Sequence, residues 1–230
     1  MKFLFKYPSR SRPDQFRAIL DRYYNFLSGK HEYEFLVSLD EDDSTMNNKS
    51  IRNYLNGKEG LSYYFGQNKS KIQAINADME KAKTDWEILF LISDDMRPKI
   101  KGFDDIIAQN MSSFFPDRDG FLHYNDGRVG KRIATLTVMG RKIYEEWGYI
   151  YHPDYISLWC DNEQTDVAKK MKKHKYFDIV LVHHDWHGGR NDSARDSLYN
   201  RNESYFNIDK KMYEKRKRYG FPKNSVKKMP

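Results

Sequence analysis

Three apolar segments in the first half of the chain end abruptly in polar or charged residues, and this pattern constrains the fold more than any other feature of the sequence. Residues 87–92 form the most apolar of the three and lead directly into Ser93-Asp94-Asp95. Residues 33–39 lead into a second acidic group, Asp40-Glu41-Asp42-Asp43. The segment 3–5 is followed by a proline and two arginines, Pro8, Arg10 and Arg12. Short apolar segments with polar boundaries are typical of buried strands.

Helical patterns separate these segments. Between residues 16 and 27 the apolar side chains recur at helical spacing, which Gly29 ends, and residues 71–81 show a second such pattern. A further strand is expected at residues 61–65. Strands that alternate with helices predict an α/β fold, in which a mostly parallel sheet has helices on both faces. Ligands of such sheets bind beyond the carboxyl ends of the strands, so we expect the acidic groups and the arginines to meet at one edge.

The second half of the chain continues the same domain. Strands are expected at residues 133–138 and 177–182, and helices at residues 141–147, 164–173 and 195–218, the last of them strongly charged. The sequence contains no internal repeat and no linker long enough to separate independent domains. We therefore expect one domain built from two halves, residues 1–110 and 111–230.

Composition excludes several classes of protein. Aromatic residues make up 15% of the chain, which argues against disorder. The single cysteine, Cys160, excludes an internal disulfide framework and a cysteine-rich zinc site. The apolar stretch near the N-terminus is too short for a signal peptide or a membrane span. We expect a cytoplasmic protein with no transmembrane segment.

The net charge of +7 raises the local concentration of anionic partners, such as nucleic acid, a membrane surface or nucleotide diphosphates. Much of the excess lies near the C-terminus, in Lys210, Lys211, Lys215, Arg216, Lys217, Arg218, Lys223, Lys227 and Lys228. Such a run is typical of a solvated helix end, and a contact of this tail with an anionic surface is the alternative. Charge alone therefore selects no partner.

The pair Asp94 and Asp95 is the first candidate for chemistry. Two adjacent carboxylates at the end of a buried strand repel one another unless a cation neutralises them. Carboxylate oxygens suit Mg²⁺ or Mn²⁺, which bind one or two protein carboxylates together with the phosphates of a substrate. The alternative is a turn or a helix cap, where aspartate is also favoured. A second acidic strand end, at Asp40, favours the metal site.

Two further groups contain candidate ligands. Asp40 is placed to accept hydrogen bonds from a base or a ribose, and Arg10 and Arg12 opposite it suit a base or a phosphate. Asn68 precedes a predicted helix that begins near Lys71. A helix N-terminus with a lysine in its first turn attracts anions, and ordinary helix capping is the alternative.

Three histidines gather around Asp185 after the strand expected at residues 177–182: His183, His184 and His187. Neutral imidazoles are metal ligands, but this spacing is not that of a zinc finger. A surface loop rich in histidine is the alternative. Two acids, Asp161 and Glu163, precede the helix expected at residues 164–173. Acids commonly cap helices at such positions, and in a cleft one of them can act as a general base.

The order of these motifs resembles GT-A glycosyltransferases of the family 2 type, in particular small bacterial and viral members. The resembling pieces of the first half are segments 7–13, 38–43, 68–76 and 93–96. Those of the second half are Asp126-Gly127, Met139-Gly140-Arg141, segments 148–152 and 157–163, His183-His184, segment 196–199 and Arg216. Each piece is short, and together they span nearly the whole chain in the order of the family.

The resemblance implies a role for each motif. A group from the first half would hold the nucleotide: Pro8, Arg10, Arg12, Asp40, Asp42, Asn68, Lys71 and Asn76. Ser93-Asp94-Asp95 would stand for the Asp-X-Asp metal motif, with serine in place of the first aspartate. The implied metal ligand is therefore Asp95, with Ser93 and Asp94 on the side of the donor. His183 or His184 would complete the metal shell. Asp161 would be the catalytic base, with Glu163 as its substitute.

The implied activity is transfer of a sugar from a nucleotide-diphosphate donor, UDP in many relatives, to an acceptor hydroxyl. The resemblance also implies inversion at the sugar and a need for Mn²⁺ or Mg²⁺. Residues 1–110 would bind the donor, and residues 111–230 would form the acceptor side with a C-terminal helical extension. Two alternatives stay open. One is a metal-dependent nuclease or phosphoesterase built on the histidines and the basic tail. The other is a non-enzymatic nucleic-acid-binding module, whose affinity would fall steeply with salt.

Overall fold

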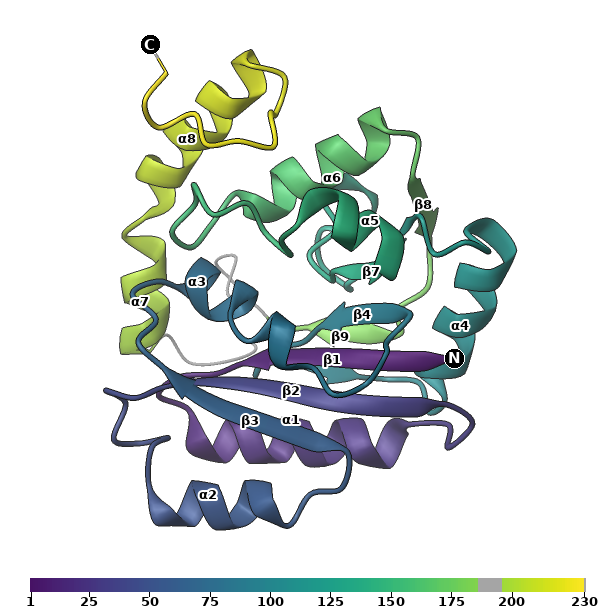
Figure 1. Ribbon diagram of the computed structural model, residues 1–230, viewed down its shortest axis with the longest axis vertical. Coiled ribbons are helices and arrows are strands. Elements are labelled where there is room, and N and C mark those ends of the chain that lie inside the picture. The colour runs from purple at the N-terminus through teal and green to yellow at the C-terminus, as the bar shows by residue number, and fades with distance from the viewer. Residues whose placement is uncertain (186–195, 230) are drawn as a thin grey trace.

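A seven-stranded sheet forms the centre of the computed structural model, which describes residues 1–185 and 196–229. The strand order is β3-β2-β1-β4-β7-β6-β8. Four strands run parallel to one another: β1 (Lys2–Pro8), β2 (Glu32–Asp40), β3 (Leu61–Gly66) and β4 (Ile88–Leu91). The strands expected from the apolar segments are therefore present, and their carboxyl ends lie at one edge of the sheet (Figure 1).

The remaining strands continue the sheet in mixed orientation. β7 (Val138–Gly140) is antiparallel to β4 and to β6 (Phe121–Tyr124), whereas β8 (His174–Phe177) is parallel to β6. The strand expected at residues 133–138 is therefore displaced, because β7 begins at Val138, the last residue of that range. The sheet is mostly parallel, as the alternation of strands and helices predicted.

The strand expected at residues 177–182 is wrong in position. β8 ends where that strand was expected to begin, and the chain resumes as β9 (Val182–His184). β9 pairs with β5 (Met96–Pro98) in a separate two-stranded sheet. Just after β8, the carboxylate of Asp178 accepts hydrogen bonds from two side chains, Asn125 and Tyr176. These bonds hold a charged residue at the point where the chain leaves the large sheet.

Helices cover both faces of the sheet (Figure 1). One layer consists of α1 (Pro13–Phe26), α2 (Lys49–Asn56) and α4 (Phe103–Phe114). The other consists of α3 (Lys71–Asn76), α5 (Arg141–Trp147) and α6 (Cys160–Lys170). Alternate residues of β1 serve the two layers, because Phe3, Phe5 and Tyr7 pack in one core and Leu4 packs in the other. This alternation is the period of two that a strand imposes.

The helix expected at residues 71–81 is divided. α3 ends at Asn76, and a short 3₁₀ helix, η1 (Met79–Lys81), follows. Asp78 between them has a φ of 63° in the left-handed region, which an α-helix does not accommodate. A second 3₁₀ helix, η2 (Gly130–Arg132), lies in the loop between β6 and β7. The sequence patterns did not identify α2 or α4.

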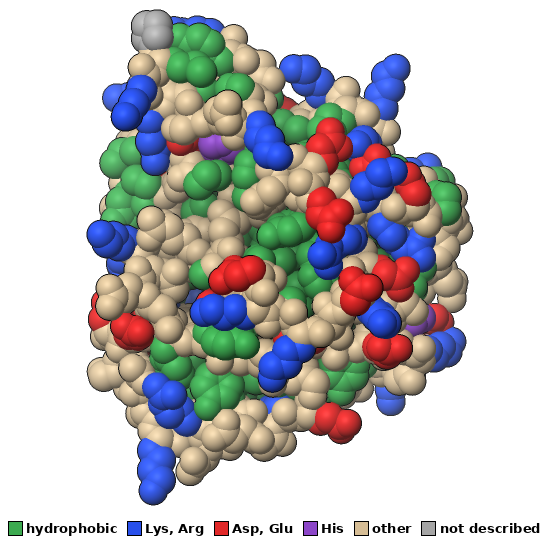
Figure 2. All heavy atoms as spheres, viewed as in Figure 1, with side chains coloured by type: hydrophobic (Ala, Val, Ile, Leu, Met, Phe, Trp, Pro, Cys, Tyr) green, Lys and Arg blue, Asp and Glu red, His purple; other side chains and the backbone are tan. Residues whose placement is uncertain are grey.

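Two C-terminal helices, α7 (Ser197–Glu203) and α8 (Phe206–Arg218), run along one side of the molecule (Figure 1). They occupy most of the charged helical segment expected at residues 195–218. Most lysines and arginines of α8 and the segment after it are exposed, as predicted for a solvated helix end. Figure 2 shows basic side chains prominent over this part of the surface. None of the helices in the described residues is long and apolar enough to cross a membrane.

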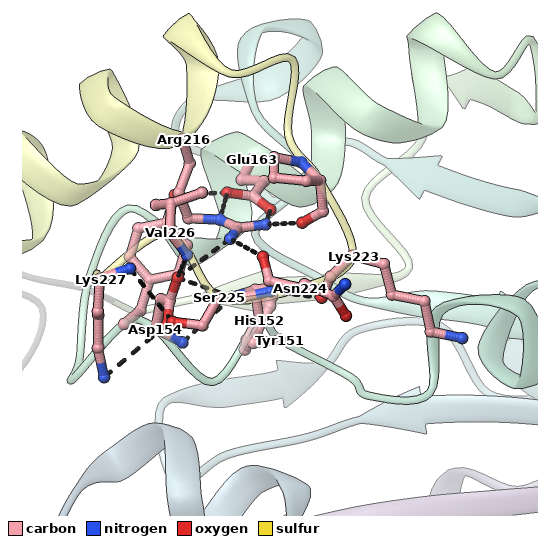
Figure 3. A network of polar contacts seen from close by, with 12 residues as sticks. Tyr151, His152, Asp154, Glu163, Arg216, Lys223, Asn224, Ser225, Val226 and Lys227 are labelled. Carbon is pink, nitrogen blue, oxygen red and sulfur yellow. Dashed lines mark hydrogen bonds and ion pairs between the residues drawn. The ribbon is translucent and has the colours of Figure 1, made fainter. Parts of the chain in front are cut away.

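A buried network of ion pairs fixes α8 to the rest of the domain (Figure 3). The side chain of Arg216 is fully buried, and its guanidinium donates to both carboxylate oxygens of Glu163, at 2.7 and 2.8 Å. It also donates to Asp154 at 3.1 Å and to the carbonyl oxygens of Pro222 and Asn224. One guanidinium therefore ties α8 to α6 and to the C-terminal segment.

Replacing Arg216 by methionine should lower the free energy of unfolding by about 3–5 kcal/mol, because the carboxylates of Glu163 and Asp154 would stay buried without their main partner. Denaturation in urea measures this change. Arg218, exposed on the same helix, provides the matched control. Arg218→Met should change the free energy by less than about 0.5 kcal/mol. A similar small effect for Arg216→Met would show that the network does not anchor the helix.

Candidate active site

The carboxyl ends of β1, β2 and β4 open into a cavity of about 430 Å³. Asp40, the last residue of β2, lines this cavity together with Asp94 and Asp95, which follow β4, and so does the segment with the two arginines. Side chains from both halves of the chain form its wall. The predicted site residues in the wall are Pro8, Arg10, Arg12, Asp40, Asn68, Lys71, Ser93, Asp94, Asp95, Asp161 and His184.

Three other predicted residues are held outside the cavity wall by their own partners. Asp42 is exposed at the rim, where it pairs with Arg10 at 2.6 Å. The side chain of Asn76 bonds to backbone groups of residues 150 and 151, and so joins α3 to that loop. Glu163 faces away from the cavity, because its carboxylate is the partner of Arg216. The geometry therefore favours Asp161 over Glu163 as a group that can reach a substrate.

Strand pairing separates the two neighbouring histidines. In the antiparallel pair β5–β9, His184 lies opposite Met96 and His183 lies opposite Arg97. Successive side chains of a strand point to opposite faces, and only His184 lines the cavity. On the other face, His183 Nδ1 lies 2.6 Å from Asp185 Oδ1. The third candidate, His187, lies outside the described residues.

Asp94 is buried directly after β4 and is held by two hydroxyl groups from the β1 segment. Tyr7 OH and Ser9 Oγ donate to the same oxygen, Asp94 Oδ1, at 3.0 and 2.9 Å. Burial, and then the neighbouring charge of Asp95, raise the pKa of Asp94 to about 7. Without a cation, therefore, the site does not favour two ionised carboxylates. No separate role was predicted for Tyr7 and Ser9, because a hydroxyl group at the end of a strand carries no signal of a partner more than 80 positions away in the chain.

Asp95 has a different environment. Ser93 Oγ donates a hydrogen bond to Asp95 Oδ1, and His184 Nε2 lies 3.6 Å from the same oxygen. Burial opposes ionisation of this carboxyl, yet His184 lowers the pKa of Asp95 well below its usual range. The other ring nitrogen, His184 Nδ1, is buried and has no hydrogen-bond partner among the described residues.

Asp95 and His184 fit a divalent cation. The 3.6 Å between His184 Nε2 and Asp95 Oδ1 is less than twice the ~2.1 Å that separates such an ion from its ligands, so one ion can contact both atoms. Within residues 1–185 and 196–229, no three acids, histidines or cysteines form a ready metal cage. Two protein ligands leave positions for phosphate oxygens and water, an arrangement common for Mg²⁺.

The acid at the end of β2 lies at another part of the cavity. Asp40 Oδ2 accepts a hydrogen bond from Arg10 at 2.8 Å, and Asp40 Oδ1 accepts one from Asn68 Nδ2 at 3.0 Å. Arg12 turns instead to Asp196, whose two oxygens lie 2.6 and 2.9 Å from the guanidinium nitrogens. Asp196 also caps α7. This ion pair joins the β1 segment to a helix 184 positions away in the sequence.

Lys71 and Asp161 line the same cavity as the two adjacent carboxylates, Asp94 and Asp95. Lys71 begins α3, which Ser70 caps by accepting a bond from Gln73 N–H, so the capping role considered from the sequence is also present. Asp161 lies in the first turn of α6. Burial raises the pKa of Asp161, and the positive charge of Lys71 opposes this change. A raised pKa makes a carboxylate a better proton acceptor near neutral pH.

Aromatic side chains line the cavity where the second half of the chain forms its wall: Trp159, Tyr199, Tyr205 and Phe206. Trp159 comes from the loop before α6, and the other three come from α7 and the start of α8. The ring centroids of Trp159 and Phe206 are 5.5 Å apart. Such faces suit the apolar side of a ring-shaped ligand. The sequence did not predict the contribution of α7 and α8, because it depends on how these helices pack.

Comparison with known proteins was made at the level of sequence and of structure. No protein-family model matches the sequence. No curated protein matches it either. Many solved structures, however, match the fold of the chain.

One of these structures is a mannosyltransferase, PcManGT from Pyrobaculum calidifontis, in complex with GDP-Man and Mn²⁺. It is 13% identical to this chain, with a TM-score of 0.61, and the match covers 82% of this chain and 58% of that one. GalNAc-T7 with UDP, GalNAc and Mn²⁺ is 11% identical, with a TM-score of 0.68 and coverage of 100% and 53%. TarS 1–349 from S. aureus, in complex with UDP, is 13% identical, with a TM-score of 0.60 and coverage of 80% and 60%.

The chain therefore spans between about half and three fifths of the length of these three structures. At 11–13% identity the likeness concerns the course of the backbone, not individual side chains. The fold of this chain is the GT-A fold, seen also in these glycosyltransferases.

Proposed function

We propose that this chain is a metal-dependent glycosyltransferase that moves a sugar from a nucleotide-diphosphate donor, with UDP as the favoured nucleotide, to an acceptor hydroxyl. The single observation that carries the proposal is the shared cavity. Asp40, Asp95 and Asp161 line the same space of about 430 Å³ together with Lys71 and His184. Carboxylates in such number would repel the phosphates of a nucleotide, so a cation is needed to bring the two together.

The first half of the chain, residues 1–110, would bind the donor. Arg10, Asp40 and Asn68 form a hydrogen-bonded group that suits a base and its ribose. Asp95 and His184 would hold Mn²⁺ or Mg²⁺, with Ser93 and Asp94 beside the donor. When bound, the ion would neutralise charge on the diphosphate. Structures of this fold with Mn²⁺ and a nucleotide or nucleotide sugar support this choice of ligand.

Asp161 would act as the base of the transfer step. Its carboxylate accepts the proton of the acceptor hydroxyl while the acceptor oxygen forms a bond to the anomeric carbon of the donor sugar. The bond from that carbon to the phosphate oxygen breaks, and the diphosphate leaves with the electron pair. Lys71 stabilises the charge that builds on the leaving group. Attack from the side opposite the leaving group inverts the configuration of the sugar.

The second half of the chain, residues 111–230, would bind the acceptor. The wall formed by Trp159, Tyr205 and Phe206 suits a sugar ring or another flat apolar face. The exposed lysines and arginines of α8 and of the segment after it lie on the same side of the molecule as α7 (Figures 1 and 2). This basic surface suits contact with an anionic surface or an anionic acceptor.

Thermal unfolding in the presence of UDP, GDP and CDP sugars, each with and without Mn²⁺, tests the proposal. A donor at 100 times its dissociation constant stabilises a protein by about 2.7 kcal/mol. For a domain of this size we expect a rise in Tm of about 5–10 °C with one nucleotide and only in the presence of the metal. Mg²⁺ in place of Mn²⁺ compares the two ions.

One combination of results would contradict the proposed function. If none of the nucleotide sugars raises Tm with either ion, and DNA or RNA binds tightly with a steep dependence on salt, the chain is a nucleic-acid-binding module. A screen for hydrolysis of nucleotide sugars would then also be negative.

A further inference from the structure

Asp209 is a buried acid on α8, a helix in which lysines and arginines outnumber acids. Its side chain has no exposed surface, and its carboxylate accepts three backbone hydrogen bonds. Asp209 Oδ1 accepts from Ile156 N–H at 3.0 Å, and Oδ2 accepts from Ser157 N–H and Leu158 N–H, both at 2.8 Å. Ionised acceptors form the stronger class of hydrogen bond. One carboxylate therefore sets the backbone of three consecutive residues, which we term the 156–158 loop.

The 156–158 loop belongs to the cavity. All three of its residues line the wall, and the chain continues from it through Trp159 into α6, where Asp161 lies in the first turn. The loop also contacts α3, because Ile156 carbonyl oxygen accepts a bond from Ile72 N–H at 3.3 Å. The loop is thus held between α8 on one side and α3 on the other.

The first turn of α6 is fixed to α8 at further points. Glu163, two residues after Asp161, accepts two hydrogen bonds from the Arg216 guanidinium, one at each carboxylate oxygen (Figure 3). One turn further along α6, Asp166 accepts a bond from Tyr213 OH at 2.6 Å. Arg216 and Tyr213 act on parts of α6 that face away from the cavity. Asp209 differs from both, because it holds the segment that forms the cavity wall.

We infer that Asp209 is a positioning residue for sugar transfer: it holds the 156–158 loop so that Asp161 is presented to the acceptor. The inference rests on the proposed function. Displacement of a reacting group by about 1 Å can lower a rate by about 100-fold. An amide in place of the Asp209 carboxylate would keep one acceptor oxygen and turn a donor toward backbone N–H groups. The loop would then shift, and Asp161 with it.

Donor binding should be independent of Asp209. The residues placed around the nucleotide belong to the central sheet: Asp40 is the last residue of β2, and Asp95 follows β4. α3, which carries Lys71, has its own attachment, since Asn76 makes three hydrogen bonds to residues 150 and 151. A positioning role for Asp209 therefore predicts a change in kcat without a change in the affinity for the donor.

The test compares Asp209→Asn with a matched substitution of another buried acid that caps backbone groups. Glu34, on β2, accepts from Lys83 N–H and Thr84 N–H, both at 2.8 Å, and does not line the cavity. For Asp209→Asn we expect kcat of transfer to fall about 10- to 100-fold. The KM for the donor and the Kd of UDP with Mn²⁺ should stay within about twofold. Glu34→Gln should leave kcat unchanged.

Amide hydrogen exchange gives a second readout. Exchange at Ile156, Ser157 and Leu158 should become faster in Asp209→Asn and should stay unchanged in Glu34→Gln. If Asp209→Asn does not bind UDP with Mn²⁺ because it fails to fold, Asp209→Glu replaces it. That variant keeps the charge and displaces the carboxylate by one methylene, and its kcat should fall with an unchanged Kd.

The outcomes separate this inference from the proposed function. If Asp209→Asn has the same kcat as the wild type, the positioning role is overturned. It is also overturned if Glu34→Gln lowers kcat as much as Asp209→Asn does. In both cases the proposed glycosyltransferase function still stands. A wild-type chain that neither binds nor turns over any nucleotide sugar overturns both. A fall in kcat with unchanged Kd, confined to Asp209, supports both.

Discussion

The Asp95→Ala variant should lose all stabilisation by a nucleotide sugar that depends on Mn²⁺, and its rate of transfer should fall by roughly 10³-fold. Asp95 is the carboxylate that stays ionised, because His184 lowers its pKa well below the usual range against the effect of burial. A metal ion contributes several kcal/mol of charge stabilisation to a transition state, and ~1.4 kcal/mol corresponds to a factor of ten in rate. Thermal shift and steady-state kinetics, each with and without Mn²⁺, measure the two effects.

An acid at the other end of the same strand is the control for this substitution. Asp85 precedes β4 and is exposed. Asp85→Ala therefore removes an aspartate side chain, as Asp95→Ala does, but from a position outside the cavity wall. It should leave the metal response and the rate unchanged. If Asp95→Ala retained a full metal-dependent rise in Tm, the assignment of Asp95 as the metal ligand would be lost.

The Asp161→Asn variant should bind the donor normally and yet transfer almost no sugar. The amide cannot accept the proton of the acceptor hydroxyl, and a general base contributes about 10²- to 10⁴-fold to a rate. The shape of the side chain is kept, so the Kd of UDP with Mn²⁺ should stay within about twofold. Calorimetry with UDP and Mn²⁺, together with turnover of a donor and an acceptor, measures both quantities.

The same helix offers the control for Asp161. Asp166 lies on α6 outside the cavity wall and accepts a bond from Tyr213. Asp166→Asn should leave transfer nearly unchanged. Unimpaired turnover in Asp161→Asn would remove this residue as the base, and weak donor binding in that variant would point to a role at the diphosphate instead.

The strand ends were predictable from the sequence because their signals are local. An apolar segment followed by acids, as at residues 33–43 and 87–95, identifies both the strand and the edge where it ends. α4 lacks such a signal. It begins after Gly102 with no side-chain cap, although Phe103, Ile107 and Met111 recur at helical spacing on its buried face. That periodicity and the two acids of the first turn, Asp104 and Asp105, are the local signals of this helix.

The remaining parts of the site depend on contacts between residues far apart in the sequence. His184 lines the cavity and His183 does not, because of how β9 pairs with β5, and no local pattern in the sequence reports this pairing. Glu163 is held away from the cavity by Arg216, at a separation of 53 positions. The resemblance implied Glu163 as the substitute for Asp161. Both lie in the first turn of α6, but Glu163 pairs with Arg216 and only Asp161 lines the cavity.

The central position of β1 has a consequence for the synthesis of the chain. β1 pairs with β2 on one side and with β4 on the other, and the segment 41–87 separates β2 from β4. While that segment leaves the ribosome, the free edge of β1 exposes unpaired N–H and C=O groups between aromatic side chains. Open edges of this kind promote association with other chains. Pairing of β4 (Ile88–Leu91) with β1 closes this edge, so the order of strands in the sheet differs from their order of synthesis.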